Sequence, residues 1–269
     1  MNAERLESAD STREIPTRAL LGLSNARQVG WPHTSALQFS AISKAAQRKA
    51  VCHGMAGMMA VIALLGALSP LILIGWALAL GFTVHANWRI ERLLADTPQI
   101  ENKRHLGLSV APAVTWAALL LWVAITGTAH QLLETWAVTA MAMAGLAFVS
   151  PALPLGTVAL SAIAGTAATL GFLWIGLIDV ALAAMALSLT IALGTIENAR
   201  NFLTARIAQS ALHEKSEVVS LLLREFEEGE ADWLWQTDTA RRVRAASPRF
   251  AFALGLDPDQ IEGQPLIQL

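Results

Sequence analysis

Residues 50–88 contain no aspartate, glutamate, lysine or arginine, and this uncharged stretch constrains the fold more than any other feature of the chain. A helix crosses the roughly 30 Å hydrocarbon core of a bilayer with about 20 mostly apolar residues. The stretch is therefore too long for one crossing, and Ser69-Pro70 near its middle favours a turn or a helix start. We expect two short transmembrane helices, over 52–68 and 71–88, joined as a hairpin.

Four more apolar segments follow a charged loop with the sequence RIERLLADTPQIENKR at 89–104. The expected spans are 106–126, 132–149, 155–175 and 178–196. They are separated by Gly127, by the proline-containing segment 150–154, and by Gly176 with Asp179. Six spans is the preferred count, and the alternative is four or five spans, with one tight hairpin re-entrant or buried.

The positions of lysine and arginine test this count independently, because loops rich in these residues stay in the cytoplasm. Basic residues precede the first span, separate the second from the third, and follow the sixth, whereas the other three loops have none. These basic residues are Lys44, Arg48, Lys49, Arg89, Arg92, Lys103, Arg104, Arg200 and Arg206. Only an even number of spans puts both flanks on the basic side, so both termini are expected in the cytoplasm.

Composition and charge exclude several classes of function. The chain is 54% hydrophobic and 15% charged, against about 45–50% and about 25% in soluble domains, so it belongs with membrane proteins. Its net charge of −2 offers no basic patch for nucleic acid. Transporters usually carry ionisable residues inside the membrane. Glu134 and Asp179 are the carboxylates near the expected spans, and both are assigned to outer loops, which disfavours a proton-coupled carrier.

Three histidines are the candidate ligands for a metal or haem. His53 opens the first span, His85 closes the second and His105 precedes the third, so the hairpin topology places all three at the cytoplasmic face. Neutral imidazoles that converge there are able to ligate a metal ion. The alternative, which we favour, is that these histidines lie solvated among lipid headgroups. No cofactor is therefore predicted.

The chain from Thr195 to about Glu228 lacks proline and glycine and is rich in strong helix formers, which predicts one long helix leaving the last span. Apolar residues recur every seven positions at Leu212, Val219 and Phe226. A second set of seam positions lies three residues after these. Leu222 provides an apolar residue there, whereas Lys215 interrupts this set. This spacing is typical of a short parallel coiled coil and predicts a homodimeric stalk. The alternative is an amphipathic helix that packs on its own soluble domain.

The last residues predict a small α+β unit. The segment 233–237 alternates like a strand, 238–241 is a turn, and 242–245 is a partner strand. Ser247 is expected to cap a helix with Pro248 in its first position, ending at Gly255. Asp257-Pro258 begins another short helix, which Gly263 closes.

The segment 214–269, EKSEVVSLLLREFEEGEADWLWQTDTARRVRAASPRFAFALGLDPDQIEGQPLIQL, resembles the linker helix and first half of a PAS sensor domain. The matching points are Asp232-Trp233-Leu234-Trp235, Thr237-Asp238, Ser247-Pro248-Arg249-Phe250, Leu254-Gly255 and Ile261-Glu262-Gly263. It is most similar to those of proteobacterial membrane receptors that continue into GGDEF and EAL domains, which make and degrade cyclic di-GMP. PAS domains also precede histidine kinases, which is the alternative output.

The resemblance implies a multi-pass protein of the bacterial inner membrane that carries a signal to an output domain. No GGDEF, EAL, phosphoacceptor-histidine or ATP-binding motif occurs in the chain, so no catalytic residue is assigned and enzymatic activity belongs to the expected parent protein. Only two strands and two helices of the PAS fold are present, which predicts a truncated domain. Because the outer loops are short, the expected cue is a small apolar ligand in the bilayer, or the state of the membrane itself.

The expected fold is thus an all-α polytopic membrane protein with an incomplete α+β end. The expected regions are a polar cytoplasmic segment (1–49), a six-helix transmembrane domain (50–196), a signalling helix (197–229) and a truncated PAS domain (230–269).

Overall fold

The computed structural model describes residues 17–21, 42–96, 102–228 and 235–266, and these residues are mostly helical. The chain divides into two compact units, Met1–Ile207 and Ala208–Leu269. The predicted polar segment 1–49 lies largely outside the described residues, although its last residues, from Ile42, belong to a helix.

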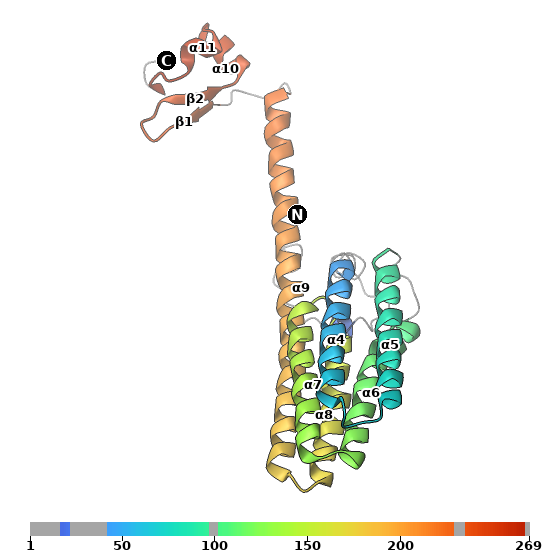
Figure 1. The fold of residues 1–269 in the computed structure, drawn as a ribbon. Helices are drawn as coiled ribbons and strands as arrows, with labels where there is room; N and C mark the ends of the chain where they lie inside the picture. Colours follow the sequence, from blue (N-terminus) through green and yellow to red (C-terminus); the bar gives the residue numbers. More distant parts are fainter. Residues whose placement is uncertain (1–16, 22–41, 97–101, 229–234, 267–269) are drawn as a thin grey trace. The chain divides into compact units, whose positions relative to one another are not determined.

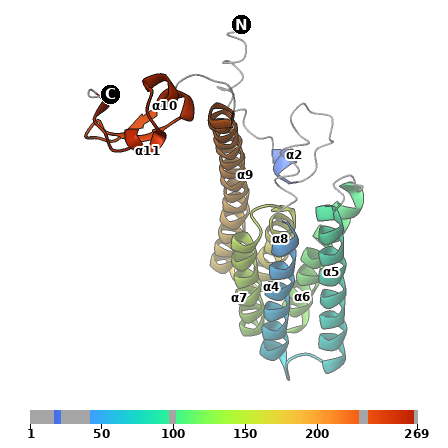
Figure 2. The ribbon, with the colours of Figure 1, turned by 90° about the horizontal axis from the view of Figure 1, so that it is seen from above.

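The first unit is a bundle of long helices that run side by side and alternate in direction (Figures 1 and 2). Its helices are α4 (Ile42–Leu64), α5 (Pro70–Asp96), α6 (Asn102–Thr126), α7 (Ala129–Val149), α8 (Leu155–Trp174) and the first part of α9 (Ile178–Glu228), with a short α2 (Thr17–Leu20) before them. Helix α6 packs along α8, and α4 packs between α5 and α7.

The turns between the helices lie where breaking residues predict them. Pro70 begins α5, and Gly66 in the preceding turn takes a left-handed φ of 82°. Thr128 and Gln131 form a capping box at the start of α7, because each side chain accepts a hydrogen bond from the other residue's backbone N–H. Gly176, with φ 81°, makes the turn before α9, as a residue without Cβ does readily.

Five helices among the described residues are long and apolar enough to cross a membrane, rather than the six expected. The helix below this threshold is α4. Its apolar part runs only from Ala50 to Leu64, because the chain leaves the helix before residue 68 and because Arg48 and Lys49 lie within the helix. The candidate spans are Pro70–Leu93, Leu106–Thr126, Ala129–Val149, Leu155–Trp174 and a segment within Ile178–Leu221.

Apolar residues fill the interior of the bundle and also cover its outer surface. Trp116 and Phe172 are fully buried, and the rings of Trp76 and Trp116 meet edge to face with centroids 5.1 Å apart. Large apolar side chains are also exposed on each of the helices α4 to α9, among them Met55, Phe82, Ile125, Phe148, Leu170 and Leu182. An exposed apolar surface of this extent suits a lipid environment rather than water.

The second unit begins with the end of α9 and then has the order strand, strand, helix, helix that the sequence predicts. Strand β1 (Trp235–Thr237) pairs antiparallel with β2 (Val243–Ala246), and α10 (Pro248–Leu254) and α11 (Pro258–Ile261) follow. Ser247 caps α10 by accepting a hydrogen bond from the N–H of Phe250. The small core is Val243, Phe250, Ala251 and Ile261. Residues Asp232-Trp233-Leu234 lie outside the described residues.

Asp238 organises the turn between the two strands. Its Oδ1 accepts hydrogen bonds from the N–H groups of Arg242 and Ala240, both at 2.9 Å, and its Oδ2 accepts one from Arg244 Nε at 3.3 Å. The N–H of Arg242 is the main cause that lowers the pKa of Asp238 below its ordinary value, and Ala240 and Arg244 act in the same direction.

Because this pKa is lower in the folded state than in the unfolded state, Asp238 stabilises the hairpin above its ordinary pKa of about 3.9. That contribution should disappear as the pH falls through the lowered pKa. We expect the ¹⁵N shift of the Ala240 amide, followed in selectively labelled protein, to titrate with a midpoint below about 3.9. The Asp238→Ala variant is the control and should lose the titration; a midpoint above the ordinary value would contradict the assignment.

Candidate functional site

Glu91 lies inside helix α5 and is almost completely buried, with 1% of its surface exposed. Glu91 was expected in a charged loop, and that expectation is wrong. The segment from Arg89 to Asp96 continues α5 because it lacks glycine and proline and contains mainly strong helix formers. Glu91 also falls within the candidate span Pro70–Leu93, so a carboxylate lies within a predicted crossing segment.

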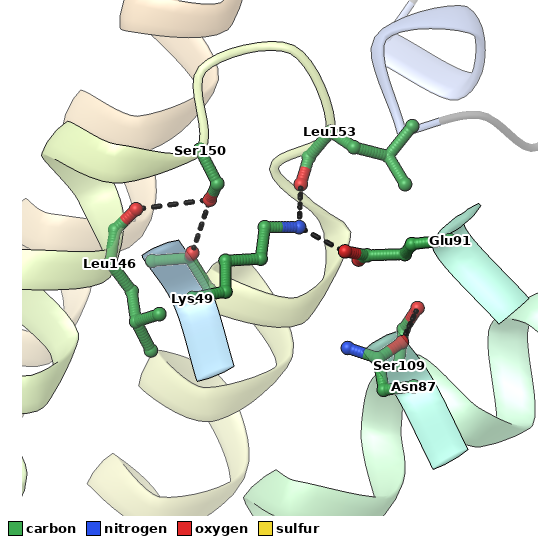
Figure 3. A network of polar contacts seen from close by, with 8 residues as sticks. Lys49, Asn87, Glu91, Ser109, Leu146, Ser150 and Leu153 are labelled. Atoms are coloured by element: carbon green, nitrogen blue, oxygen red, sulfur yellow. Dashed lines mark hydrogen bonds and ion pairs between the residues drawn. The ribbon is translucent and has the colours of Figure 1, made fainter. Parts of the chain in front are cut away.

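Lys49 of α4 supplies the opposite charge. Its Nζ lies 2.8 Å from Glu91 Oε1 and also donates a hydrogen bond to the carbonyl oxygen of Leu153 at 3.2 Å (Figure 3). The side chains of Lys49 and Glu91 are only 8% and 2% exposed. One ammonium group thus joins α4, α5 and the loop between α7 and α8.

Because Lys49 and Glu91 are both buried, the stability of the bundle depends on the contact between them. The attraction between two buried charges offsets the cost of removing them from water only while both are present. Glu91 Oε2 is buried and has no hydrogen-bond partner among the described residues, so its desolvation is only partly compensated. A change that separates Lys49 from Glu91 therefore carries a large free-energy cost.

The loop that Lys49 contacts is held in place from both sides. Ser150 Oγ donates to the carbonyl of Leu146 at 3.0 Å and lies 3.2 Å from Thr157 Oγ1, which links the end of α7 to the start of α8 (Figure 3). Ser150 and Thr157 are both buried, and so are Ala152 and Leu153 in the loop. The loop is therefore a packed part of the bundle.

Helix α9 packs against the same loop. Phe202 of α9 contacts Ala152 and Leu153, and the guanidinium of Arg206 lies 5.4 Å from the centre of the Phe202 ring. Asn198 Nδ2 donates a hydrogen bond to the carbonyl of Ala147 in α7 at 3.2 Å. We call Lys49, Glu91, Leu153 and Phe202 the junction, because together they connect α4 and α5 to α9.

A second polar contact lies close to the junction on α5 (Figure 3). Ser109 Oγ of α6 donates to Asn87 Oδ1 at 3.4 Å, and both residues are buried. Asn87 precedes Glu91 by one helical turn, so this contact and the ion pair attach neighbouring turns of α5 to two different helices.

The three candidate histidines lie in different surroundings. His53 is 8% exposed, and its Nδ1 accepts a hydrogen bond from Trp116 Nε1 at 3.3 Å. His85 is exposed, and its ring lies 5.4 Å from that of Trp88. The side chain of His105 lies outside the described residues, although its backbone belongs to α6. In the part of the chain that the structure describes, no group of three or more metal-ligating side chains comes together.

Glu134 and Asp179, which were expected in outer loops, lie in helices instead. Glu134 is in α7 and pairs with His130 at 3.4 Å, and Asp179 is in the first turn of α9. Neither is part of the junction. The sequence does indicate that Glu91 belongs to this helix, because no helix-breaking residue separates it from the apolar span before it.

Comparisons with models of known protein families, with curated proteins and with solved structures found no match for this chain.

Proposed function

We propose that this chain is the membrane-anchored sensory and signal-transducing region of a cyclic di-GMP signalling protein. The observation that carries the proposal is helix α9, which continues without a break from an apolar membrane segment to Glu228. Because α9 is a single helix, it offers a route by which a movement of its apolar part is passed along the chain toward Glu228.

In this proposal the bundle has six spans, with α4 as the first and both chain ends in the cytoplasm. Support for α4 as a span comes from its packing between α5 and α7 and from the exposed methionines Met55, Met58 and Met59 on its outer face. Lys49 lies at the charged end of α4, where an interfacial lysine is expected.

The junction is the proposed route from the bundle to α9. A displacement of α5 against α4 strains the Lys49–Glu91 pair, which is bonded to the loop that carries Leu153. Because Phe202 packs on this loop, the displacement reaches α9 near the point where its apolar segment ends. A buried ion pair suits such a role, because its two charges are stabilised only while they are in contact. Intermediate separations are therefore unfavourable, and the pair changes between discrete arrangements.

The proposed output step is a change in a parallel dimer formed by α9. Leu212 and Val219 are 69% and 55% exposed and lie seven residues apart, as a coiled-coil seam requires. The side chains of Leu222 and Phe226, the other predicted seam positions, lie outside the described residues.

A cysteine at Val219 should therefore cross-link to its twin in membranes, in a background where the native Cys52 is replaced by alanine. The matched control is Val218→Cys, because Val218 is as exposed, at 50%, but lies off the seam. We expect the Val219 cysteine to form dimers several-fold faster under mild oxidation. Equal rates, or no dimer from either variant, would contradict a parallel seam at this position.

The cyclic di-GMP assignment rests on the PAS resemblance of the second unit, whose strands, Ser247 cap and Gly255 turn agree with that resemblance. The alternative output is a histidine kinase. The coding sequence that follows Leu269 distinguishes the two, because GGDEF or EAL motifs there support the proposal and a phosphoacceptor histidine with an ATP-binding domain overturns it.

A transport function is a weaker candidate that one observation favours. Glu91 Oε2 is a buried acceptor without a partner among the described residues, as a proton-carrying carboxylate would be. Protein-dependent proton flux in liposomes that is lost in Glu91→Gln would favour transport over sensing.

A further inference from the structure

An elongated apolar groove runs between α4 and α5. It has a volume of about 440 Å³, which is within the roughly 300–1,000 Å³ typical of small-molecule sites. On α4 it extends from Ala50 to Ile62, which is about 18 Å at 1.5 Å per residue. Its walls are mostly apolar, and Gly54 and Gly81 leave open space where other residues would fill it.

The groove contains one buried polar side chain, that of His53. Because its Nδ1 accepts the hydrogen bond from Trp116, a neutral His53 carries its proton on Nε2. His53 lines the groove, and its Nε2–H has no acceptor among the described residues, although this atom is not fully buried. No water satisfies such a donor in an apolar groove that faces lipid, so an acceptor from a bound molecule is favoured there.

At the Ala50 end the groove continues into a second, more polar depression. This depression is lined by Gln47, Ala50, Val51, His85, Trp88 and Arg92, and Ala50 is common to both. The Arg92 guanidinium and the His85 ring both lie close to the Trp88 ring, at 4.9 Å and 5.4 Å from its centre. A cation and several hydrogen-bond donors therefore lie at one end of the apolar groove.

We propose that this groove binds a single-chain carboxylic acid from the bilayer, namely a long-chain fatty acid. The hydrocarbon chain lies along α4 and α5 toward Ile62, and the carboxylate lies at the level of Ala50, between His53 and Arg92. Opposite charge favours the acidic head at the Arg92 end, and one groove between two helices accommodates one chain. The inference rests on the proposed function in one respect, since it supplies the class of the apolar cue.

The site also lies next to the junction. His53 follows Lys49 by one turn of α4, and Arg92 follows Glu91 directly on α5. A fatty acid that brings α4 and α5 together, or separates them, thereby acts on the Lys49–Glu91 pair.

The test uses the full chain in zwitterionic nanodiscs with a palmitic acid analogue that carries a photoreactive diazirine. We expect the label on peptides from 50–62 and 76–92, displaced by palmitate but not by methyl palmitate, which lacks the charge. Gly81→Leu fills the groove and should reduce labelling on the order of tenfold. Gly75→Leu is the matched control, because Gly75 is on the same helix, has open space around its Cβ position and does not line the groove. Arg92→Gln should weaken displacement by palmitate.

Equal labelling of the Gly81→Leu and Gly75→Leu proteins would overturn the site. Equal displacement by methyl palmitate would overturn the carboxylate, and stronger displacement by phosphatidylglycerol would assign the groove to bilayer phospholipid instead. Cross-linking at Val219, measured in the same nanodiscs, separates the two proposals. If cross-linking persists while photolabelling fails, the proposed ligand is wrong and the dimeric stalk stands. If cross-linking fails while photolabelling succeeds, the fatty-acid site stands and the dimeric stalk is wrong.

Discussion

Replacing Glu91 with glutamine should lower the free energy of unfolding by about 3–5 kcal/mol, the cost of leaving a buried charge without its partner. Lys49 would keep only its hydrogen bond to the Leu153 carbonyl, while its charge stays on a side chain that is only 8% exposed. Equilibrium unfolding of the purified chain by SDS in mixed micelles measures this effect.

Two further variants show whether the pair itself is responsible. The double variant Lys49→Met with Glu91→Leu removes both charges and should recover most of the loss, because apolar residues of similar volume replace a buried ion pair well. Arg89→Gln removes an exposed charge from the same helix and should change the free energy by less than about 0.5 kcal/mol. A loss in Glu91→Gln no larger than that in Arg89→Gln would contradict the burial of the pair, because a solvated ion pair contributes little to stability.

Replacing Gly165 with alanine should destabilise the contact between α8 and α9 by about 1–3 kcal/mol, although alanine is the better helix former. A Cβ atom at Gly165 would lie 2.5 Å from Ser188 Cβ and overlap its hydroxyl oxygen, and Ser188 is itself buried. The two helices would have to move apart at this point.

Ser188→Gly should restore part of the loss in Gly165→Ala, because it removes the overlapping atoms. Gly194→Ala, on α9 with open space at its Cβ position, is the control and should stabilise by about 0.5–1 kcal/mol. The same unfolding experiment measures all of these variants. A stable Gly165→Ala protein would show that α8 and α9 are not in close contact there.

Helix positions in this chain follow from local rules, and for that reason most were predictable. Pro70, Gly176 and Gly255 each begin or end an element where the sequence indicates. The Ser247 cap followed from its position before Pro248. Length and hydropathy located four of the apolar spans within a few residues, because lipid requires about 20 apolar residues of each.

The junction was not predictable by the same rules, because it depends on contacts between distant residues. Lys49 and Glu91 are 42 positions apart, and Lys49 and Leu153 are 104 apart. The charge of Glu91 favours a loop in the sequence, because the sequence does not indicate that Lys49, 42 positions away, lies against it. The first span was overestimated for the converse reason: the predicted segment 52–68 counted apolar residues beyond Leu64 that lie outside the helix.

The histidines illustrate a similar limit. Sequence position put His53 and His85 near one end of the bundle, but it could not separate a buried imidazole bonded to Trp116 from an exposed one beside Trp88. Whether a side chain points inward depends on the rotation of its helix, which neighbouring helices determine.

We propose that the junction couples the membrane bundle to α9, and cross-linking at the proposed dimer seam reports on this coupling directly. The measurement is the ratio of oxidative cross-linking at Val219 to that at Val218, with and without Glu91→Gln, in native membranes. If the junction transmits a shift, Glu91→Gln should change this ratio by about fivefold or more, as a coupling of ordinary strength does, and Lys49→Met with Glu91→Leu should return it toward the original value. An unchanged ratio in a Glu91→Gln protein that is measurably less stable would contradict the claim, because the ion pair would then stabilise the bundle without controlling α9.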